Sequence, residues 1–148
     1  KNIAGAEIIK AEESKNIAGV KIMGVEGYNL KIPNHQKGKD LGFIVEMQGK
    51  RIYHAGDTDL IEEMKQIKNI DLALLPVGGT YTMDVDQAVE AVKLIQPKVV
   101  IPMHYGKIKL GSQEFELKAD IDDFKNKVEQ LTKTKAVVLS PSQEYILE

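Results

Sequence analysis

From residue 72 to residue 139, short apolar runs alternate with segments that repeat apolar residues at helical spacing. The apolar runs have the length of buried strands and occupy residues 72–75, 99–101 and 136–139. The segments between them place apolar side chains on one helical face and occupy residues 84–95 and 121–131. Asp84 and Gln87 have the spacing of a capping box. Because strands that alternate with helices usually run parallel, this pattern predicts an α/β fold.

The first third of the chain predicts antiparallel structure instead. Apolar residues indicate a strand at residues 20–25, and alternation over residues 41–47 predicts another. A short Gln48-Gly49 turn then leads into residues 51–55, which is typical of a hairpin.

Two further segments flank this hairpin. Residues 28–38 have the Asn, Pro and Gly content of a long loop, and long loops inside compact domains are often functional. Residues 60–67 place apolar side chains at helical spacing and predict a short helix. With 148 residues, 43% of them hydrophobic, and no low-complexity tract, we expect residues 1–148 to form a single domain.

The charge balance bears on the class of partner. The chain carries 20 basic and 22 acidic residues, a formal net charge of −2 and a pI near 6.0, and the two signs are interspersed. There is no basic field to hold a phosphate backbone, so nucleic-acid binding is disfavoured, although a local patch remains open. We expect a small-molecule substrate, and a homo-oligomer is compatible with the sequence.

The residue types also limit the chemistry and the compartment. With no Cys, the chain has no disulfide, thiolate zinc site or Cys nucleophile, and its nitrogen ligands are His35, His54 and His104. No apolar stretch reaches the length of a membrane span, and the first residues have no signal-peptide core. We therefore expect a cytoplasmic protein. The first residue is not Met, and we expect a fragment or a trimmed product.

Polar side chains follow three of the predicted strands. Asp57 follows the second strand of the hairpin, Gly78-Gly79 follows the strand at residues 72–75, and His104 follows the strand at residues 99–101. The carboxyl ends of parallel strands meet at one edge of a sheet, where open α/β sheets bind ligands. We expect these segments to form one pocket.

Asp57 and His104 are the candidate catalytic and metal-ligating residues. Taken alone, Asp57 is better explained as a helix N-cap, and His104 as a hydrogen-bonded histidine at a strand end. Two segments that agree on one rim favour the ligand interpretation. Pro102 indicates that its strand is ending, which frees the His104 imidazole to face the rim. Carboxylate oxygen and imidazole nitrogen suit zinc, manganese or iron(II).

The other two histidines each have more than one interpretation. His54 lies on a strand three residues before Asp57 and is either a substrate contact, a donor that orients a ligand, or a buried structural residue. His35 lies in the long loop and is either a metal ligand or an exposed residue without a task.

The glycine pair and its neighbours form a weaker signal. Gly79, Thr80 and Tyr81 are candidate substrate contacts, with backbone amides near an anion and Tyr81 over the pocket, although paired glycines often mark an ordinary turn. Asp59 is expected to complement a helix dipole. The lysine-rich segment at residues 107–118 is interpreted as a solvated surface.

Three motifs in order carry a resemblance to a known family. They are Ile52-Tyr53-His54-Ala55-Gly56-Asp57-Thr58, residues 74–83 (LLPVGGTYTM) and Pro102-Met103-His104-Tyr105. With them the chain resembles the metallo-β-lactamase superfamily, and most closely its branch of small metal-dependent hydrolases that includes ascorbate-6-phosphate lactonase-like proteins. The resemblance covers residues 20–105 well and the remaining tail generally.

The resemblance implies the carboxyl-terminal half of an αββα sandwich with a one- or two-metal site at its rim, and hydrolysis by a metal-bound hydroxide. Asp57 matches the carboxylate that bridges two metals, and His104 matches the last histidine ligand, of the second metal. The family's His-x-His-x-Asp-His signature is absent from these 148 residues. Its middle histidine falls near Tyr28-Asn29, so either Asn29 substitutes for it or His35 reaches in from the same loop.

The leading functional hypothesis is a metal-dependent hydrolase of a small ester, lactone or phosphorylated compound. Its cofactor would be one or two divalent metals, zinc first, with manganese or iron as alternatives. Asp57, His104 and His35 would be the metal ligands, and His54, Gly79, Thr80 and Tyr81 would contact substrate or orient ligands. The alternative is a non-catalytic binding or assembly module that keeps part of the fold. A nuclease of the same superfamily is disfavoured by the acidic pI.

Overall fold

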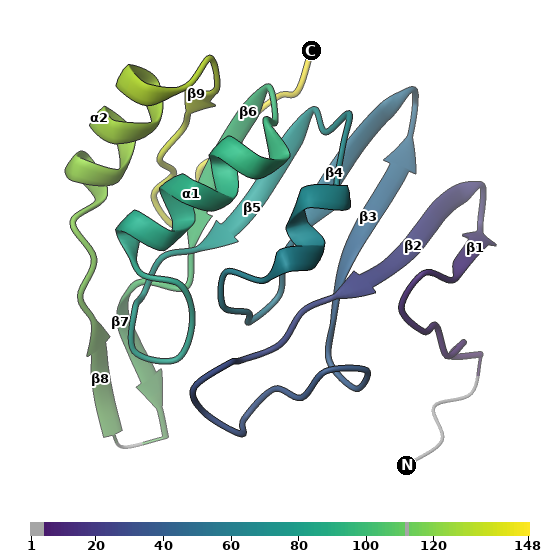
Figure 1. Cartoon of the computed structure of the whole chain (residues 1–148), viewed down its shortest axis with the longest axis horizontal. Coiled ribbons are helices and arrows are strands. Elements are labelled where there is room, and N and C mark those ends of the chain that lie inside the picture. Colours follow the sequence, from purple (N-terminus) through teal and green to yellow (C-terminus); the bar gives the residue numbers. More distant parts are fainter. Residues whose placement is uncertain (1–4, 112) are drawn as a thin grey trace.

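The computed structural model describes residues 5–111 and 113–148, and its centre is a mixed β-sheet (Figure 1). The order of the seven strands in this sheet is β1-β2-β3-β4-β5-β6-β9. Their bounds are β1 (Ser14–Ile17), β2 (Val20–Glu26), β3 (Leu41–Met47), β4 (Lys50–His54), β5 (Leu72–Pro76), β6 (Val99–Met103) and β9 (Lys135–Ala136). Strands β1 to β4 pair antiparallel, whereas β4, β5, β6 and β9 pair parallel. The predicted α/β class is confirmed.

Two tight turns connect the antiparallel strands. Gln48 and Gly49 both have positive φ, at 50° and 73°, between β3 and β4. Ala18 and Gly19 do the same between β1 and β2, at 50° and 82°. Two consecutive positive φ values define the turn whose twist matches a β-hairpin. The predicted hairpin over residues 41–55 is therefore confirmed.

The helices are α1 (Val85–Ile95), α2 (Ile121–Leu131) and a 3₁₀ helix, η1 (Glu62–Gln66). The predicted capping box is present, because the Asp84 side chain accepts from the Gln87 backbone and the Gln87 side chain accepts from the Asp84 backbone. The helix predicted at residues 60–67 is shorter and tighter than expected. Ile61 is extended and offers no side-chain cap, so a single 3₁₀ segment forms around the buried Met64.

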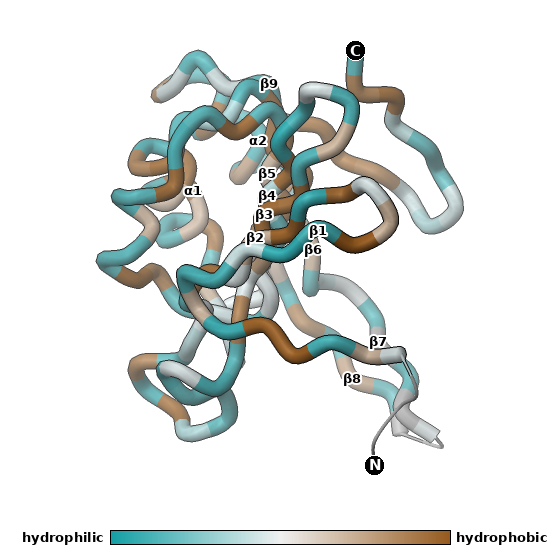
Figure 2. The backbone as a smooth tube through the Cα atoms, turned by 90° about the vertical axis from the view of Figure 1, so that its right-hand side faces the viewer, coloured by the Kyte–Doolittle hydropathy of each residue, from teal (hydrophilic) through white to brown (hydrophobic). Residues whose placement is uncertain are grey.

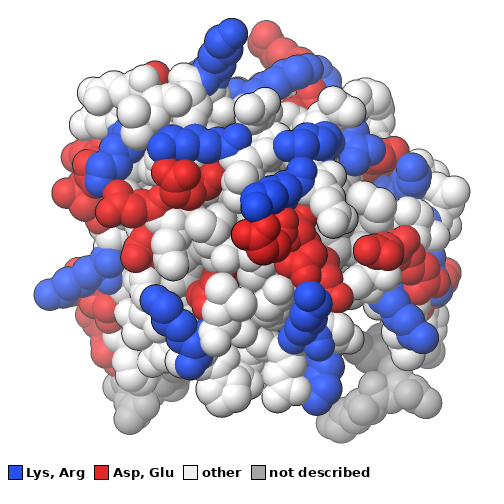
Figure 3. All heavy atoms as spheres, in the orientation of Figure 1, with Lys and Arg blue, Asp and Glu red and all other residues white. Residues whose placement is uncertain are grey.

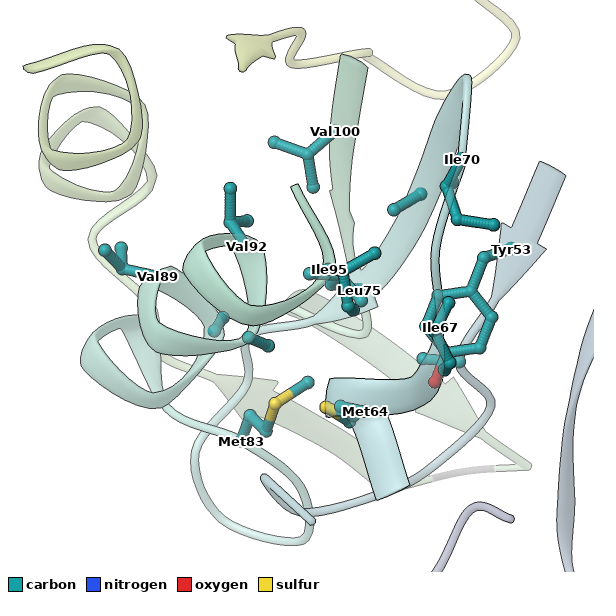
Figure 4. Packing of buried hydrophobic residues seen from close by; sticks show 14 of the residues in the cluster. Tyr53, Met64, Ile67, Ile70, Leu75, Met83, Val89, Val92, Ile95 and Val100 are labelled. Atoms are coloured by element: carbon teal, nitrogen blue, oxygen red, sulfur yellow. The ribbon is translucent and has the colours of Figure 1, made fainter. Parts of the chain in front are cut away.

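The main core lies between one face of the sheet and the helices. Tyr53, Leu75 and Val100 point from three neighbouring strands toward α1, α2 and η1, and each is fully buried (Figure 4). Val92 of α1 and Phe124 of α2 close the layer above them and are equally buried. In Figure 2 the sheet is seen edge-on, with these helices on its left side. This packing holds the carboxyl ends of β4, β5 and β6 in a fixed relation.

The opposite face of the sheet is also apolar. Leu72, Val99 and Ile101 are buried there, partly under Tyr145 and Leu147 of the C-terminal segment (Figure 2, right side). The strand predicted at residues 136–139 is mostly wrong, because only Lys135–Ala136 pairs with β6. Beyond it the Val137 amide still donates to the Val100 carbonyl, and the chain then crosses this face.

A two-stranded sheet extends from the lower edge of the molecule, formed by β7 (Gly106–Leu110) and β8 (Gln113–Leu117) (Figure 1). Residues 107–118 were expected only to form a solvated surface, and the hairpin was not predicted. Lys107 pairs with Glu116 and Lys109 with Glu114, so the charged residues do share one exposed face. Within the described residues, no helix combines the length and the apolar character that a membrane crossing requires.

Candidate metal centre

Three loops meet at the carboxyl ends of β4, β5 and β6, at the lower edge of the sheet in Figure 1. The Val77 amide donates to the Met103 carbonyl at 3.0 Å, which joins the loops after β5 and β6. The Met83 amide donates to the Thr58 carbonyl at 3.2 Å, which joins the loops after β5 and β4. The predicted convergence of these segments on one rim is confirmed.

Asp57 is the centre of this rim. Its Oδ2 atom lies 3.5 Å from Nε2 of His104 and 3.6 Å from Nε2 of His35. Two imidazoles from distant parts of the chain therefore face one carboxylate oxygen. The exposed fraction of the side chain is 39% for Asp57, 31% for His35 and 24% for His104, so all three groups are accessible to solvent.

These separations are longer than a good hydrogen bond. Zinc bonds to nitrogen and oxygen of about 2.0–2.2 Å place neighbouring tetrahedral ligands about 3.4 Å apart, which matches both distances around Asp57. Across the described residues, however, no group of three or more His, Asp or Glu side chains is placed so that it could hold a metal ion by itself. The two distances around Asp57 and the absence of such a group are compatible if His35, Asp57 and His104 supply only part of the ligands of a metal ion.

Gly78 determines where His104 lies. His104 has a positive φ of 58°, which is uncommon for a residue with a side chain and carries a strain cost. A methyl group on Gly78 would overlap the His104 carbonyl oxygen and lie 3.3 Å from its Nδ1 atom. That Nδ1 atom is buried and finds no hydrogen-bond partner among the described residues. The glycine therefore permits the close approach that directs Nε2 of His104 at Asp57.

His35 is oriented by a second carboxylate. Its Nδ1 atom lies 3.4 Å from Oδ1 of Asp40, while its Nε2 atom faces Asp57. The backbone amide of Gln36, and after it the His35 ring, lowers the pKa of the Asp40 carboxyl. A carboxylate on the outer nitrogen of a histidine is the arrangement that orients metal-ligating imidazoles. Asp40 was not among the predicted site residues, although its position five residues after His35 in the same loop was a usable signal.

Asn29 and His35 were the alternatives for the middle ligand of the family. The structure brings His35 to Asp57, whereas the Asn29 side chain bonds to backbone groups. Its Nδ2 donates to the Tyr81 carbonyl at 2.9 Å, and its Oδ1 accepts from the His35 amide at 3.2 Å. The geometry therefore favours His35 as the ligand-type residue of this loop.

The loop at residues 27–40 is tied to the segment that follows Asp57. Asp59 was expected to complement a helix dipole, but its Oδ2 accepts from the Leu30 amide at 2.7 Å, so that prediction is corrected. Thr58 is fully buried, and its hydroxyl accepts from the Tyr28 amide at 3.0 Å. These bonds fix the loop next to the carboxylate that its histidine faces.

A second attachment of the same loop uses Glu63 of η1. Its carboxylate accepts from the Tyr28 hydroxyl at 3.1 Å and from the Lys37 ammonium at 2.5 Å. The Lys37 ammonium also lies 5.2 Å from the centre of the Tyr28 ring and lowers the pKa of the Glu63 carboxyl. Tyr28 precedes His35 in sequence and Lys37 follows it, so the loop is attached to η1 on both sides of His35.

The remaining predicted site residues are not drawn into this cluster. His54 is exposed on β4, and its Nδ1 accepts from the Gly56 amide at 3.1 Å. The amides of Gly79 and Thr80 donate to the Met83 and Gly78 carbonyls, so the expectation that they approach an anion is corrected. Tyr81 is 49% exposed at the rim. Its contact to Asn29 runs through its backbone.

A cleft of about 690 Å³ lies at the opposite edge of the sheet. The C-terminal ends of α1 and α2 form its walls, with Lys93, Lys98 and Lys133 among the lining residues and no carboxylate. It contains none of the residue types that make up the Asp57 cluster, and helix C-termini carry the negative end of the dipole. The Asp57 rim is therefore the better candidate for catalysis.

Comparison with known proteins identifies the family. The sequence profile of the β-lactamase superfamily domain matches residues 3–104, which include Asp57, His35 and His104. The chain belongs to the β-lactamase superfamily. It is 46% identical over 112 residues to a UPF0173 metal-dependent hydrolase of Staphylothermus marinus, in a match covering 74% of this chain and 46% of the relative. A UPF0173 metal-dependent hydrolase of Pyrococcus abyssi is 36% identical over 167 residues, covering 96% and 71%.

Solved structures agree with this superfamily assignment. A metallo hydrolase from the archaeon Ignicoccus hospitalis superposes with a TM-score of 0.73 at 34% identity, covering 90% of this chain and 57% of that one. The metallo-β-lactamase fold expected from the three sequence motifs is confirmed. The chain spans about half the length of several of the superfamily members it matches.

Proposed function

We propose that this chain supplies Asp57, His104 and His35 to the metal centre of a hydrolase. The observation that carries the proposal is the single carboxylate oxygen faced by two imidazole nitrogens at 3.5 and 3.6 Å. A carboxylate and two histidines are the ligand types of catalytic zinc and also suit manganese and iron. Superfamily relatives named metal-dependent hydrolases support the same class.

The donor chemistry of the site fits a divalent metal. A metal held there supplies a coordinated water of lowered pKa, and hence a nucleophile at neutral pH. Because no three of the described side chains are placed to hold a metal ion by themselves, further ligands would complete the set. One or two metal ions are compatible with this arrangement.

The protein's own groups would then position the reaction. Asp57 is partly open to solvent, so its carboxylate can accept a hydrogen bond from an attacking water and orient it. Gly78 keeps His104 in place, and Asp40 keeps the His35 ring turned toward Asp57. The exposed Tyr81 side chain stands at the same rim and is the candidate substrate contact.

The surface supports a small-molecule substrate. Acidic and basic side chains intermingle over the helical face, with no extended field of one sign (Figure 3). The net charge of −2 also offers no general attraction for a nucleic-acid backbone. We propose a small ester, lactone or phosphorylated compound as the substrate class.

One observation favours a second candidate function. The described residues do not by themselves form a complete metal cage, which is also what a non-catalytic binding or assembly module would show. Such a module would keep the fold and lose metal-dependent turnover.

The test is hydrolysis by the intact protein against a panel of lactones and phosphoesters, with and without added zinc. The hydrolase proposal predicts zinc-dependent turnover that Asp57→Ala reduces by about 10³-fold or more, since it removes a ligand to the catalytic metal. Asp86→Ala is the matched control, because that exposed aspartate on α1 pairs only with Lys127 among the described residues. No turnover on any substrate, with zinc bound, would favour the binding module.

A further inference from the structure

The side chain of Asn29 joins two loops of the rim. Its Nδ2 donates to the Tyr81 carbonyl at 2.9 Å, and its Oδ1 accepts from the His35 amide at 3.2 Å. The Asn29 backbone amide donates in turn to the His35 carbonyl at 3.0 Å. One residue therefore holds the backbone of the ligand-type histidine at two points and the loop of Tyr81 at a third.

Asn29 is itself held firmly by its neighbours in sequence. The preceding residue, Tyr28, donates its amide to Thr58, and the following residue, Leu30, donates its amide to Asp59. Both acceptors follow Asp57 directly in the chain. The Asn29 side chain thus starts from a backbone that is fixed to Thr58 and Asp59, and its amide reaches the Tyr81 carbonyl.

An amide is suited to this task. Asparagine offers a donor and an acceptor at the end of a short side chain, whereas aspartate offers acceptors alone and alanine offers neither. The donor end is needed for the Tyr81 carbonyl and the acceptor end for the His35 amide. Single substitutions can therefore break one bond or both.

We propose that Asn29 is a positioning residue. It holds His35 in the position that faces Asp57, and it fixes the loop at residues 78–83, which carries Tyr81, relative to the same site. Through Asn29, the conformation of the loop at residues 27–40 and the conformation of the loop at residues 78–83 depend on each other. The statement about substrate rests on the proposed function, while the link between the loops does not.

The experiment compares Asn29→Ala and Asn29→Asp with Asn34→Ala, which truncates an exposed asparagine of the same loop. Zinc affinity of the intact protein is measured by competition with a chelator, and backbone opening by amide hydrogen exchange. Asn29→Ala removes both side-chain bonds. It is expected to weaken zinc binding about 3- to 10-fold, which corresponds to the lost bond to the His35 amide alone, and to speed exchange in residues 29–36 and 78–83. Asn34→Ala should change neither measurement.

Asn29→Asp separates the two bonds. It keeps an acceptor for the His35 amide and loses the donor to Tyr81, so exchange should rise more in residues 78–83 than in residues 29–36. A purely structural role would instead raise exchange throughout the chain and leave the zinc affinity of the folded fraction unchanged.

The positioning role is overturned if Asn29→Ala binds zinc as tightly as wild type, or if its residues 78–83 exchange at the wild-type rate. If wild-type protein binds no zinc, the proposed function fails, and the exchange rates alone then decide whether Asn29 links the loops.

Discussion

Nε2 of His104 lies 3.5 Å from Oδ2 of Asp57, although 47 positions in sequence and two different strand ends separate the residues. The pair exists because β4, β5 and β6 are parallel neighbours with β5 in the middle. The loop after β5 therefore lies between the two side chains in the sheet order, and its Gly78 leaves the room that His104 occupies.

Gly78→Ala is expected to displace His104 and weaken zinc binding by about 10-fold or more, because the new methyl group overlaps the His104 carbonyl. Zinc affinity by chelator competition measures the effect. Gly49→Ala is the control, because it places a side chain at a φ of 73° in the remote β3–β4 turn. It should lower stability by about 1 kcal/mol without changing zinc affinity. Equal zinc affinity in both variants would show that Gly78 does not position His104.

Leu75→Ala should lower the free energy of unfolding by about 2–5 kcal/mol, since Leu75 is fully buried between the sheet and the helices. Leu131→Ala serves as the comparison. This leucine ends α2 with 57% of its surface exposed, so the loss should stay within about 0.5 kcal/mol. Denaturant melts of both variants provide the measurement, and a similar loss in the two would contradict the assignment of the core.

Asp71 predicts a pH dependence of stability. Its carboxylate accepts from the Lys98 ammonium at 2.7 Å and the Arg51 amide at 2.8 Å, and these bonds lower the pKa of the Asp71 carboxyl. The folded state therefore binds the proton more weakly than the unfolded state. The stabilisation is present above the unfolded pKa of about 3.9 and is lost as the pH falls through the lower, folded-state pKa.

Asp71→Asn should accordingly destabilise the protein at pH 7 by about 1 kcal/mol, a modest value because the exposed Lys98 is screened by water. Thermal melts of wild type and variant at pH 7 and near pH 3 measure the difference. The gap should narrow on acidification. A gap that stays constant or widens toward pH 3 would contradict the sign of the pKa shift.

Local patterns predicted much of the fold. The start of α1 followed from the Asp84 capping box, because cap chemistry is carried by a few adjacent residues. The hairpin over β3 and β4 followed from strict alternation and its two-residue turn. The hairpin of β7 and β8 was missed, although lysines 107 and 109 already alternate at strand spacing, since interspersed charge was taken as a solvated surface.

Part of the candidate site was also predictable from the sequence. Asp57 and His104 could be brought together because parallel topology places strand ends at one rim. The contact of His35 with Asp57 depends on how a long loop folds back, and no periodicity encodes that path. It rests on a hydrogen bond that the Asn29 side chain donates and on bonds that the carboxylates of Asp59 and Glu63 accept, with partners up to 52 positions away.

The central claim is that Asp57 holds a divalent metal together with the two histidines. The most direct test is the metal content of the intact protein after exhaustive dialysis, determined for wild type and for Asp57→Ala, with thermal melts to verify that both are folded. The account predicts one or two retained equivalents in wild type and their loss in the folded Asp57→Ala protein. An Asp57→Ala protein that retains the wild-type metal content would contradict it.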